Sequence, residues 1–169
     1  MDSKALHKLT HGLYIVGVKD GDSFGGCVVD AVAQASMGNT PNIVLCSMLK
    51  NYTNELIKIE KEFTLSVLGT DVDPFIIANF GFQSARTVDK WANVPHEIKD
   101  GLPVVNDAIS YIRLKLVETT ELETHSMFLC ETVDAWLGEK TSKPLVFGDY
   151  QDSMKGLAME AFKAFSEKK

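Results

Sequence analysis

The sequence has few cysteines and no long apolar run, and each shortage excludes a class of protein. Its three cysteines, Cys27, Cys46 and Cys130, are widely spaced and odd in number. They therefore form neither a disulfide framework nor a paired metal site, and we interpret them as reduced interior thiols. No apolar segment approaches the roughly 20 residues of a membrane-spanning helix, and MDSKALHKL lacks the apolar core of a signal peptide. We expect a cytoplasmic protein with no metal and no membrane partner.

Positive charge is also scarce. The chain carries 17 basic against 23 acidic residues, a net charge of −6. This balance disfavours a nucleic-acid backbone as partner, so any bound anion must meet a local cluster of cations. Common enzyme motifs are missing too: there is no Gly-rich dinucleotide fingerprint, no P-loop and no His-rich metal spacing. GDSFGG contains a serine but lacks the strand, elbow and helix around a hydrolase nucleophile.

What is present predicts one domain rich in β-structure. The 169 residues, 45% of them apolar, can fill a continuous core, and no repeat or linker interrupts them, so we expect a single domain over residues 1–169. LYIVGV and SFGGCVVDAVAQAS flank the Asp-Gly turn in KDGD, which is typical of a hairpin. Further strands are predicted at PNIVLCSML, FTLSVLG, residues 112–116 and HSMFLCETVDAWL.

Helices are predicted at four places between and after these strands. They are residues 3–9, TNELIKIEK with Thr53 as its cap, DPFIIANF with Pro74 in its first turn, and an amphipathic helix at about 152–168. Six or seven strands against three or four helices favour a mainly β fold, an antiparallel barrel with peripheral helices. An α+β sandwich stays open as an alternative, because a strand count does not show closure.

Cationic and hydroxyl side chains gather at two places in this acidic chain. FGFQSARTVDKW contains Ser84, Arg86 and Lys90, the combination of hydroxyl, guanidinium and ammonium that binds a phosphate dianion. At 50–53 the sequence Lys-Asn-Tyr-Thr lies where a strand ends and a helix begins, so Lys50 and free backbone N–H groups could bind one anion. A solvated surface is the alternative for either cluster alone.

His125 is the one histidine with a candidate chemical role. It stands in ETHSMF, where a strand emerges from a polar turn, and histidine changes its charge most readily near neutral pH. A structural histidine bonded to Glu121 or Glu123 is the alternative interpretation.

Four segments together resemble the flavin-reductase-like family with the FMN-binding split barrel, of the flavoredoxin and rubredoxin-linked NADH:flavin oxidoreductase type. They are LTHGLYIVGVKDGDSFGGCVVDAVAQAS, LKNYTNELI, FGFQSARTVDKW and THSMFLCETVDA, within about residues 5–137. The resemblance implies a split β-barrel homodimer with FMN at the subunit interface. It implies hydride transfer from NADH or NADPH to flavin, and electron transfer onward to free flavin, a metal complex or a redox partner protein. No cysteine pairs of a fused rubredoxin follow.

Two other functions stay open. One is an FMN-dependent electron-transfer protein without its own nicotinamide reaction, and the other is a non-catalytic barrel that uses its surface.

The resemblance also implies which residues bind the cofactor. The phosphate would meet two sets of residues, one being Phe82, Ser84, Ala85, Arg86 and Lys90, the other Lys50, Asn51, Tyr52 and Thr53. The flavin ring would lie along a backbone segment that contains Asp30, Ala31, Val32, Gln34, Ala35 and Ser36. His125 would lie on the nicotinamide side, in a catalytic role. Relatives of this type commonly carry Asn-Thr in place of Asp30-Ala31, and an ionised Asp30 would make the flavin harder to reduce.

Overall fold

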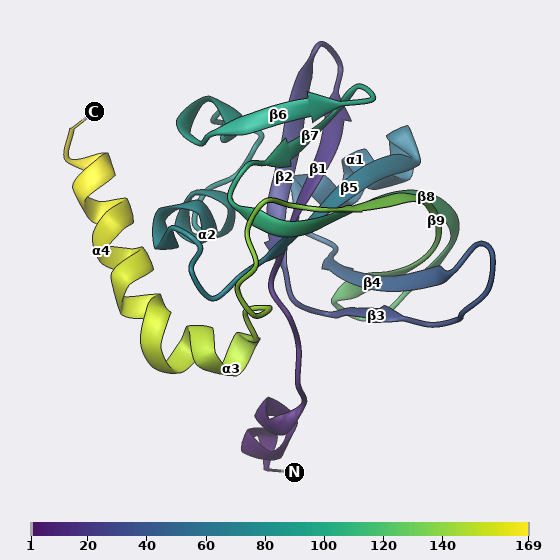
Figure 1. Ribbon diagram of the computed structural model, residues 1–169, viewed down its shortest axis with the longest axis horizontal. Coiled ribbons are helices and arrows are strands. Elements are labelled where there is room, and N and C mark those ends of the chain that lie inside the picture. Colours follow the sequence, from purple (N-terminus) through teal and green to yellow (C-terminus); the bar gives the residue numbers. More distant parts are fainter. Residues whose placement is uncertain (1, 169) are drawn as a thin grey trace.

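A computed structural model describes residues 2–168, which are built around one seven-stranded antiparallel sheet (Figure 1). The strands follow the order β2-β1-β5-β8-β9-β4-β3 across the sheet. In chain order their bounds are β1 (Tyr14–Asp20), β2 (Ser23–Val29), β3 (Val32–Gln34), β4 (Asn42–Met48), β5 (Glu62–Leu68), β8 (Ala108–Glu121) and β9 (His125–Leu137). A separate hairpin pairs β6 (His96–Lys99) with β7 (Leu102–Val105).

Helices surround this sheet, and none of them within residues 2–168 is long and apolar enough to cross a membrane. The α-helices are α1 (Tyr52–Glu60), α2 (Pro74–Gly81), α3 (Phe147–Asp149) and α4 (Lys155–Ser166). Short 3-10 turns cover Ser3–Lys8 and Trp91–Asn93, and a π-helical turn, Tyr150–Met154, joins α3 to α4.

The sheet curves around one apolar cluster. Six strands, β1, β2, β4, β5, β8 and β9, contribute buried side chains to it, and α1 adds Leu56 and Ile57. Its members include Cys27 and Val29 from β2, at one edge of the sheet, and Ile43 and Leu45 from β4, next to the other edge. A flat sheet could not bring these side chains together, so the mainly β, barrel-like fold with peripheral helices is confirmed over the α+β sandwich.

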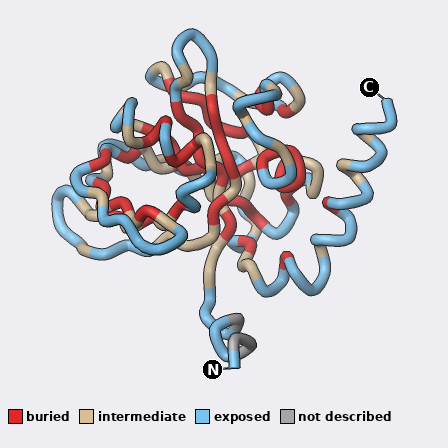
Figure 2. The backbone as a smooth tube through the Cα atoms, turned by 180° about the vertical axis from the view of Figure 1, so that it is seen from behind, coloured by how far each residue is buried: buried red, intermediate tan, exposed pale blue. Residues whose placement is uncertain are grey.

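A second apolar cluster lies outside the barrel, between the sheet, α2 and the C-terminal segment. Helix α4 packs along α2 through two aromatic pairs, Phe75 with Phe165 at 4.9 Å and Phe82 with Phe162 at 5.6 Å between ring centroids. Figure 2 shows α4 exposed over most of its length, whereas burial is concentrated in the central strands. The C-terminal helix is therefore attached mainly by one aromatic face.

Two adjacent glycines in β2 allow both α1 and α2 to pack closely against that strand. A Cβ atom on Gly25 would lie 2.3 Å from a methyl carbon of Leu56 in α1. A Cβ atom on Gly26 would lie 2.6 Å from the Val16 carbonyl oxygen and 2.9 Å from the Phe80 ring at the end of α2. Any larger residue would push the helices away from β2. The positions of the two helices thus depend on the Gly-Gly pair.

Most predicted elements form, with three corrections. The prediction of six or seven strands was too low, because the β6–β7 hairpin and the short β3 were missed. Thr53 does not cap α1: the N-cap is Asn51, and the buried Thr53 lies in the first turn. Helical structure near the C-terminus begins at Phe147, several residues before the expected start. The hairpin had a signal in Asp100-Gly101, whose positive φ angles of 50° and 80° form its turn.

Candidate functional site

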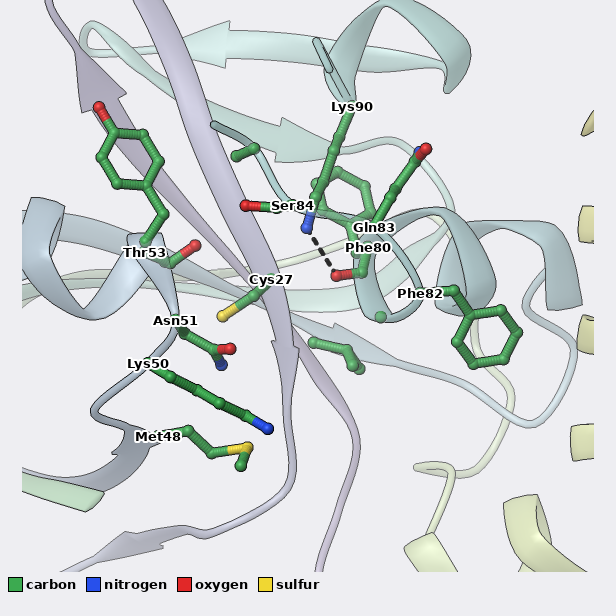
Figure 3. A pocket seen from close by; sticks show the side chains of 14 residues that line it. Cys27, Met48, Lys50, Asn51, Thr53, Phe80, Phe82, Gln83, Ser84 and Lys90 are labelled. Carbon is green, nitrogen blue, oxygen red and sulfur yellow. Dashed lines mark hydrogen bonds between the residues drawn. The ribbon is translucent and has the colours of Figure 1, made fainter. Parts of the chain in front are cut away.

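A cavity of about 390 Å³ opens between the start of α1 and the segment that follows α2 (Figure 3). Strand β2 runs between these two walls, and Cys27 on that strand lies between them in Figure 3. The cavity is lined by Cys27, Val28, Met48, Lys50, Asn51, Tyr52, Thr53, Phe80, Gly81, Phe82, Gln83, Ser84, Ala85 and Lys90. The two cation-bearing segments predicted from the sequence therefore meet in one cavity.

The first wall is the beginning of α1. Asn51 is extended, with φ −76° and ψ 129°, and its side chain makes no capping hydrogen bond. The first N–H groups of a helix have no partner within the helix, so those of Tyr52 and Thr53 are available to an anion at this wall. Asn54 holds the first turn of α1 against β4 and β9, because its side-chain amide donates to the Ser47 carbonyl and the Ser126 hydroxyl, both at 3.0 Å. The exposed Lys50 adds a cation.

The second wall contains Lys90, a buried cation that is only 3% exposed. Its ammonium group donates to the carbonyl oxygens of Gly26 at 3.0 Å and Phe80 at 2.8 Å. Burial lowers the pKa of Lys90 from 10.5 to about 8. Next to it, the Trp91 indole N–H donates to the Gly25 carbonyl at 3.0 Å. Lys90 therefore both anchors this wall to β2 and brings charge to the cavity.

Cys27 is a cavity residue that sequence reasoning missed. It was interpreted as a reduced interior thiol, and it is indeed free and buried, but it also lines the cavity. Burial raises the pKa of its thiol, an effect that the Thr53 hydroxyl and the Lys90 ammonium oppose. Met48, Phe80, Gly81, Gln83 and Val28 were missed as well. Met48 ends β4, whereas the positions of the other four follow from the packing of α2 against β2, for which the sequence held no signal beyond Gly25-Gly26.

Arg86 is not among the residues that line the cavity. Its guanidinium forms an ion pair with Glu55 and lies 4.3 Å from the centre of the Tyr52 ring. It lines a separate surface hollow with Asp20 and Ser23 at the tip of the β1–β2 hairpin. The Tyr52 hydroxyl donates to Asp20 at 2.8 Å, a bond that raises the pKa of Tyr52. Ser84 and Lys90 thus meet in the cavity, whereas Arg86 faces the next surface.

The predicted ring segment continues directly from the cavity wall. Asp30 follows Val28 and Val29 and lines a smaller apolar cavity next to the first. Residues 32–34 form β3, which is the last strand of the sheet, so its outer edge presents unpaired backbone groups. The Ala31 carbonyl accepts from the Cys46 N–H, and the Ser36 hydroxyl accepts from the Asn42 N–H. None of the six predicted ring-segment residues, Asp30, Ala31, Val32, Gln34, Ala35 and Ser36, lines the larger cavity.

His125 lies beside the rim of the cavity. It is the direct partner of Met48 across the β4–β9 pair, so both side chains project from the same face of the sheet. Met48 lines the cavity. The Nδ1 atom of His125 is 2.8 Å from the Thr124 hydroxyl, while Glu121 pairs with Lys58 and with Ser126. Within residues 2–168, neither Glu121 nor Glu123 forms a hydrogen bond or ion pair with His125.

The cavity fits a flavin nucleotide on its chemistry. Two ammonium groups, two hydroxyls and a helix N-terminus face one space, which is the donor set that a phosphate dianion requires. The space is within the usual range for a small-molecule site. A barrel with this cavity between α1 and α2 can hold a nucleotide through its phosphate.

Comparison with known proteins shows the family to which the chain belongs. Residues 6–156 match the model of the flavin reductase like domain, so the chain belongs to the flavin reductase-like family. A high molecular weight rubredoxin from Moorella thermoacetica is 34% identical over 98% of this chain and 72% of its own length. A ferric-chelate reductase (NAD(P)H) from Archaeoglobus fulgidus is 29% identical over the whole of both chains.

A solved structure shows the same fold. An FMN-binding protein from Thermus thermophilus, with bound 1-cyclohex-2-enone, superposes with a TM-score of 0.71. It is 23% identical in sequence, and the match covers 79% of this chain and 74% of that one.

Proposed function

We propose that this oxidoreductase binds FMN and transfers hydride to it from NADH or NADPH, with electrons passing onward to free flavin, a metal complex or a partner protein. The convergence of Lys50, Ser84 and Lys90 with the start of α1 in one cavity carries the proposal. A terminal phosphate dianion, as in FMN, suits this set of donors best. The relatives named for rubredoxin and for ferric-chelate reduction support onward transfer to a protein or a metal complex.

In this proposal the flavin supplies the redox chemistry, and the chain supplies position and charge. Lys50 closes over the phosphate from the exposed side, while Lys90 meets it from the buried wall. The ring then follows β2 toward Asp30 and the free edge of β3, where backbone groups bind its polar edge. An ionised Asp30 near the ring makes the bound flavin harder to reduce.

FMN should bind more tightly than riboflavin, which lacks the phosphate, and Lys50→Met should reduce that preference about tenfold. A charge-assisted hydrogen bond contributes about 1.5 kcal/mol or more, and tenfold in affinity corresponds to 1.4 kcal/mol. Arg86→Met is the matched variant: Arg86 is paired with Glu55 outside the cavity, so it should change the preference by less than Lys50→Met. Fluorescence titration of both ligands measures the preference. Equal affinities for FMN and riboflavin in the unmutated protein would overturn the proposal.

We further propose that His125 lines the nicotinamide side of the flavin. His125→Ala should then leave FMN affinity and melting temperature nearly unchanged but slow flavin reduction by NADH about tenfold or more, because the lost contact acts in the hydride-transfer complex. His96→Ala is the matched control: that ring packs against Trp91 at 5.5 Å and bonds the Val94 carbonyl, so its loss should lower stability instead. Stopped-flow reduction and thermal melts decide. A His125→Ala protein that melts early but reduces at the original rate would make His125 structural.

The alternative function, electron transfer without a nicotinamide reaction, differs in one measurement. Anaerobic NADH or NADPH should bleach the flavin absorption of the loaded protein if the proposed reaction occurs. An unchanged spectrum would favour the alternative.

We also propose a homodimer that completes the flavin site. Large apolar side chains are exposed on the two long strands, β8 and β9, and on the β3–β4 connection. The exposed fraction is 54% for Val117, 49% for Val133, 85% for Leu137 and 89% for Met37. Exposed apolar groups of this size are typical of a subunit interface. Light scattering at micromolar concentration should report about twice the chain mass of 18.6 kDa. A monomer that holds FMN tightly would contradict this expectation.

A further inference from the structure

A second, apolar cavity lies beside the flavin cavity, and the function proposed above assigns it no ligand of its own, although the proposed flavin ring extends toward Asp30 at its wall. Its volume is about 150 Å³, and we call it the apolar slot. The slot shares three residues with the flavin cavity, Val28, Gly81 and Phe82, so the two spaces adjoin along the contact between β2 and α2. Phe147 and Tyr150, from the helical segment that precedes α4, form another part of its wall.

The size and lining of the slot suit one six-membered ring. Leu13, Val29 and Ile77 give it an aliphatic interior, and Phe82 and Phe147 add aromatic faces. An apolar cavity of about 150 Å³ is the size at which engineered protein cavities stay dry and bind benzene. A bicyclic or larger compound would need the slot to expand.

Two polar groups line this apolar space, and each is available to a ligand. Tyr150 is only 6% exposed, and within residues 2–168 its hydroxyl has no hydrogen-bond partner. Burial raises the pKa of Tyr150, so the hydroxyl stays protonated and can donate. The carboxylate of Asp30, which also lines the slot, makes no hydrogen bond or ion pair within the same residues. Within residues 2–168 the buried side-chain polar atoms without a partner belong to Ser47 and Arg113, so the Tyr150 hydroxyl oxygen is accessible and can bond a ligand in the slot.

We propose that the apolar slot binds a monocyclic phenol or quinone, whose hydroxyl or carbonyl oxygen accepts a hydrogen bond from the Tyr150 hydroxyl. A phenol can in turn donate its own proton to the Asp30 carboxylate. The position of this ring beside a flavin rests on the proposed function, whereas its binding to the slot does not. In the loaded enzyme the slot would hold an organic electron acceptor at the wall that it shares with the flavin cavity. Two electrons and two protons from the reduced flavin would convert a quinone to a hydroquinone and leave the flavin oxidised.

Phenol and toluene form a matched pair of probes, because they have the same shape and differ in the hydroxyl. We expect flavin-free protein to bind phenol with a dissociation constant on the order of 1 mM, as suits a ligand of about seven heavy atoms. Amide chemical shifts in a titration of ¹⁵N-labelled protein should move at Val28, Val29 and Gly81. Tyr150→Phe should weaken phenol binding about tenfold and leave toluene binding unchanged. Tyr14→Phe, which removes a hydroxyl outside the slot, is the control and should leave both unchanged.

The same titration with FMN-saturated protein separates the proposed occupant from its rival, the flavin ring itself. Phenol binding that persists beside FMN, with the same dependence on Tyr150, supports the proposal. Loss of phenol binding on saturation with FMN would show that the flavin fills the slot, and would overturn it. Equal phenol affinities of the Tyr150→Phe and unmutated proteins would also overturn the proposal. The same holds if no chemical shift changes at a phenol concentration of 20 times the expected dissociation constant. If phenol binds as expected but FMN does not bind at all, the proposed slot ligand is supported and the proposed cofactor is wrong.

Discussion

Lys90→Met is expected to lower FMN affinity by about a hundredfold and to reduce the free energy of unfolding by about 2 kcal/mol. The ammonium group donates to two backbone carbonyls, of Gly26 and Phe80, and methionine fills the space but leaves both acceptors without a partner. An unsatisfied buried acceptor costs about 1–3 kcal/mol, and removal of the charged lysine from an apolar site offsets part of that cost. Urea unfolding and FMN titration measure the two effects.

Lys50→Met is the control for this variant. Lys50 is exposed and has no ion pair within residues 2–168, so its replacement should weaken FMN binding with little change in stability. Comparison of the two variants separates the effect of a lost positive charge on FMN affinity from the effect of the lost carbonyl hydrogen bonds on stability. If Lys90→Met unfolds at the same urea concentration as the unmutated protein, the two carbonyl bonds do not support the fold. If it binds FMN normally, Lys90 has no part in the phosphate site.

FMN affinity should also fall steeply above pH 8, by about tenfold or more between pH 7.5 and pH 9.5. The pKa of Lys90 is about 8 in the flavin-free protein, so the group is charged below that pH and loses its proton above it. A bound phosphate dianion favours the charged form and raises this pKa, so binding takes up a proton in that range. Affinity that requires proton uptake falls by up to tenfold for each pH unit. Dissociation constants measured at half-unit steps give the profile.

Riboflavin is the control for the pH profile, because it has the same ring and no phosphate. Its affinity should change little over this range, and Lys90→Met should flatten the FMN profile. A parallel fall for riboflavin would assign the effect to the ring. The stability of the flavin-free protein should rise over the pH range in which FMN affinity falls. Between pH 8 and 10.5 the unfolded chain keeps the Lys90 proton that the folded protein has lost. The contribution of Lys90 to the free energy of unfolding therefore increases with pH.

The elements that the sequence predicted well are those with a local signal. The Asp-Gly turn before β2, Pro74 at the first turn of α2 and the alternation in β8 and β9 each depend on neighbouring residues, and each element formed. The two cationic segments also have a local signal, since each joins a cation to a hydroxyl within a few residues. Their convergence followed from the resemblance to a family and could not be derived from spacing, because Lys50 and Lys90 are 40 residues apart.

The side-chain directions within the site could not be predicted. In FGFQSARTVDKW, Arg86 and Lys90 look equivalent, but the turn after α2 directs Lys90 to the Gly26 carbonyl of β2 and Arg86 to Glu55 on α1. The choice depends on tertiary contacts that a linear pattern does not contain. Cys27 is a similar case: its apolar neighbours indicate burial, and only the packing of the two helices around Gly25-Gly26 leaves an opening above it.

The attachment of residues 90 and 91 to Gly26 and Gly25 has a consequence for the order of folding. These bonds join positions 64 and 66 residues apart, so they cannot form until β2 has paired with β1 and α2 has docked. Such long-range contacts require costly loop closure and are made late. We therefore expect the proposed flavin site to be completed late in folding, so that a ligand that needs both walls binds no earlier intermediate. At a concentration of 100 times its dissociation constant, such a ligand would stabilise the native state by about 2.7 kcal/mol and leave the preceding states unaffected.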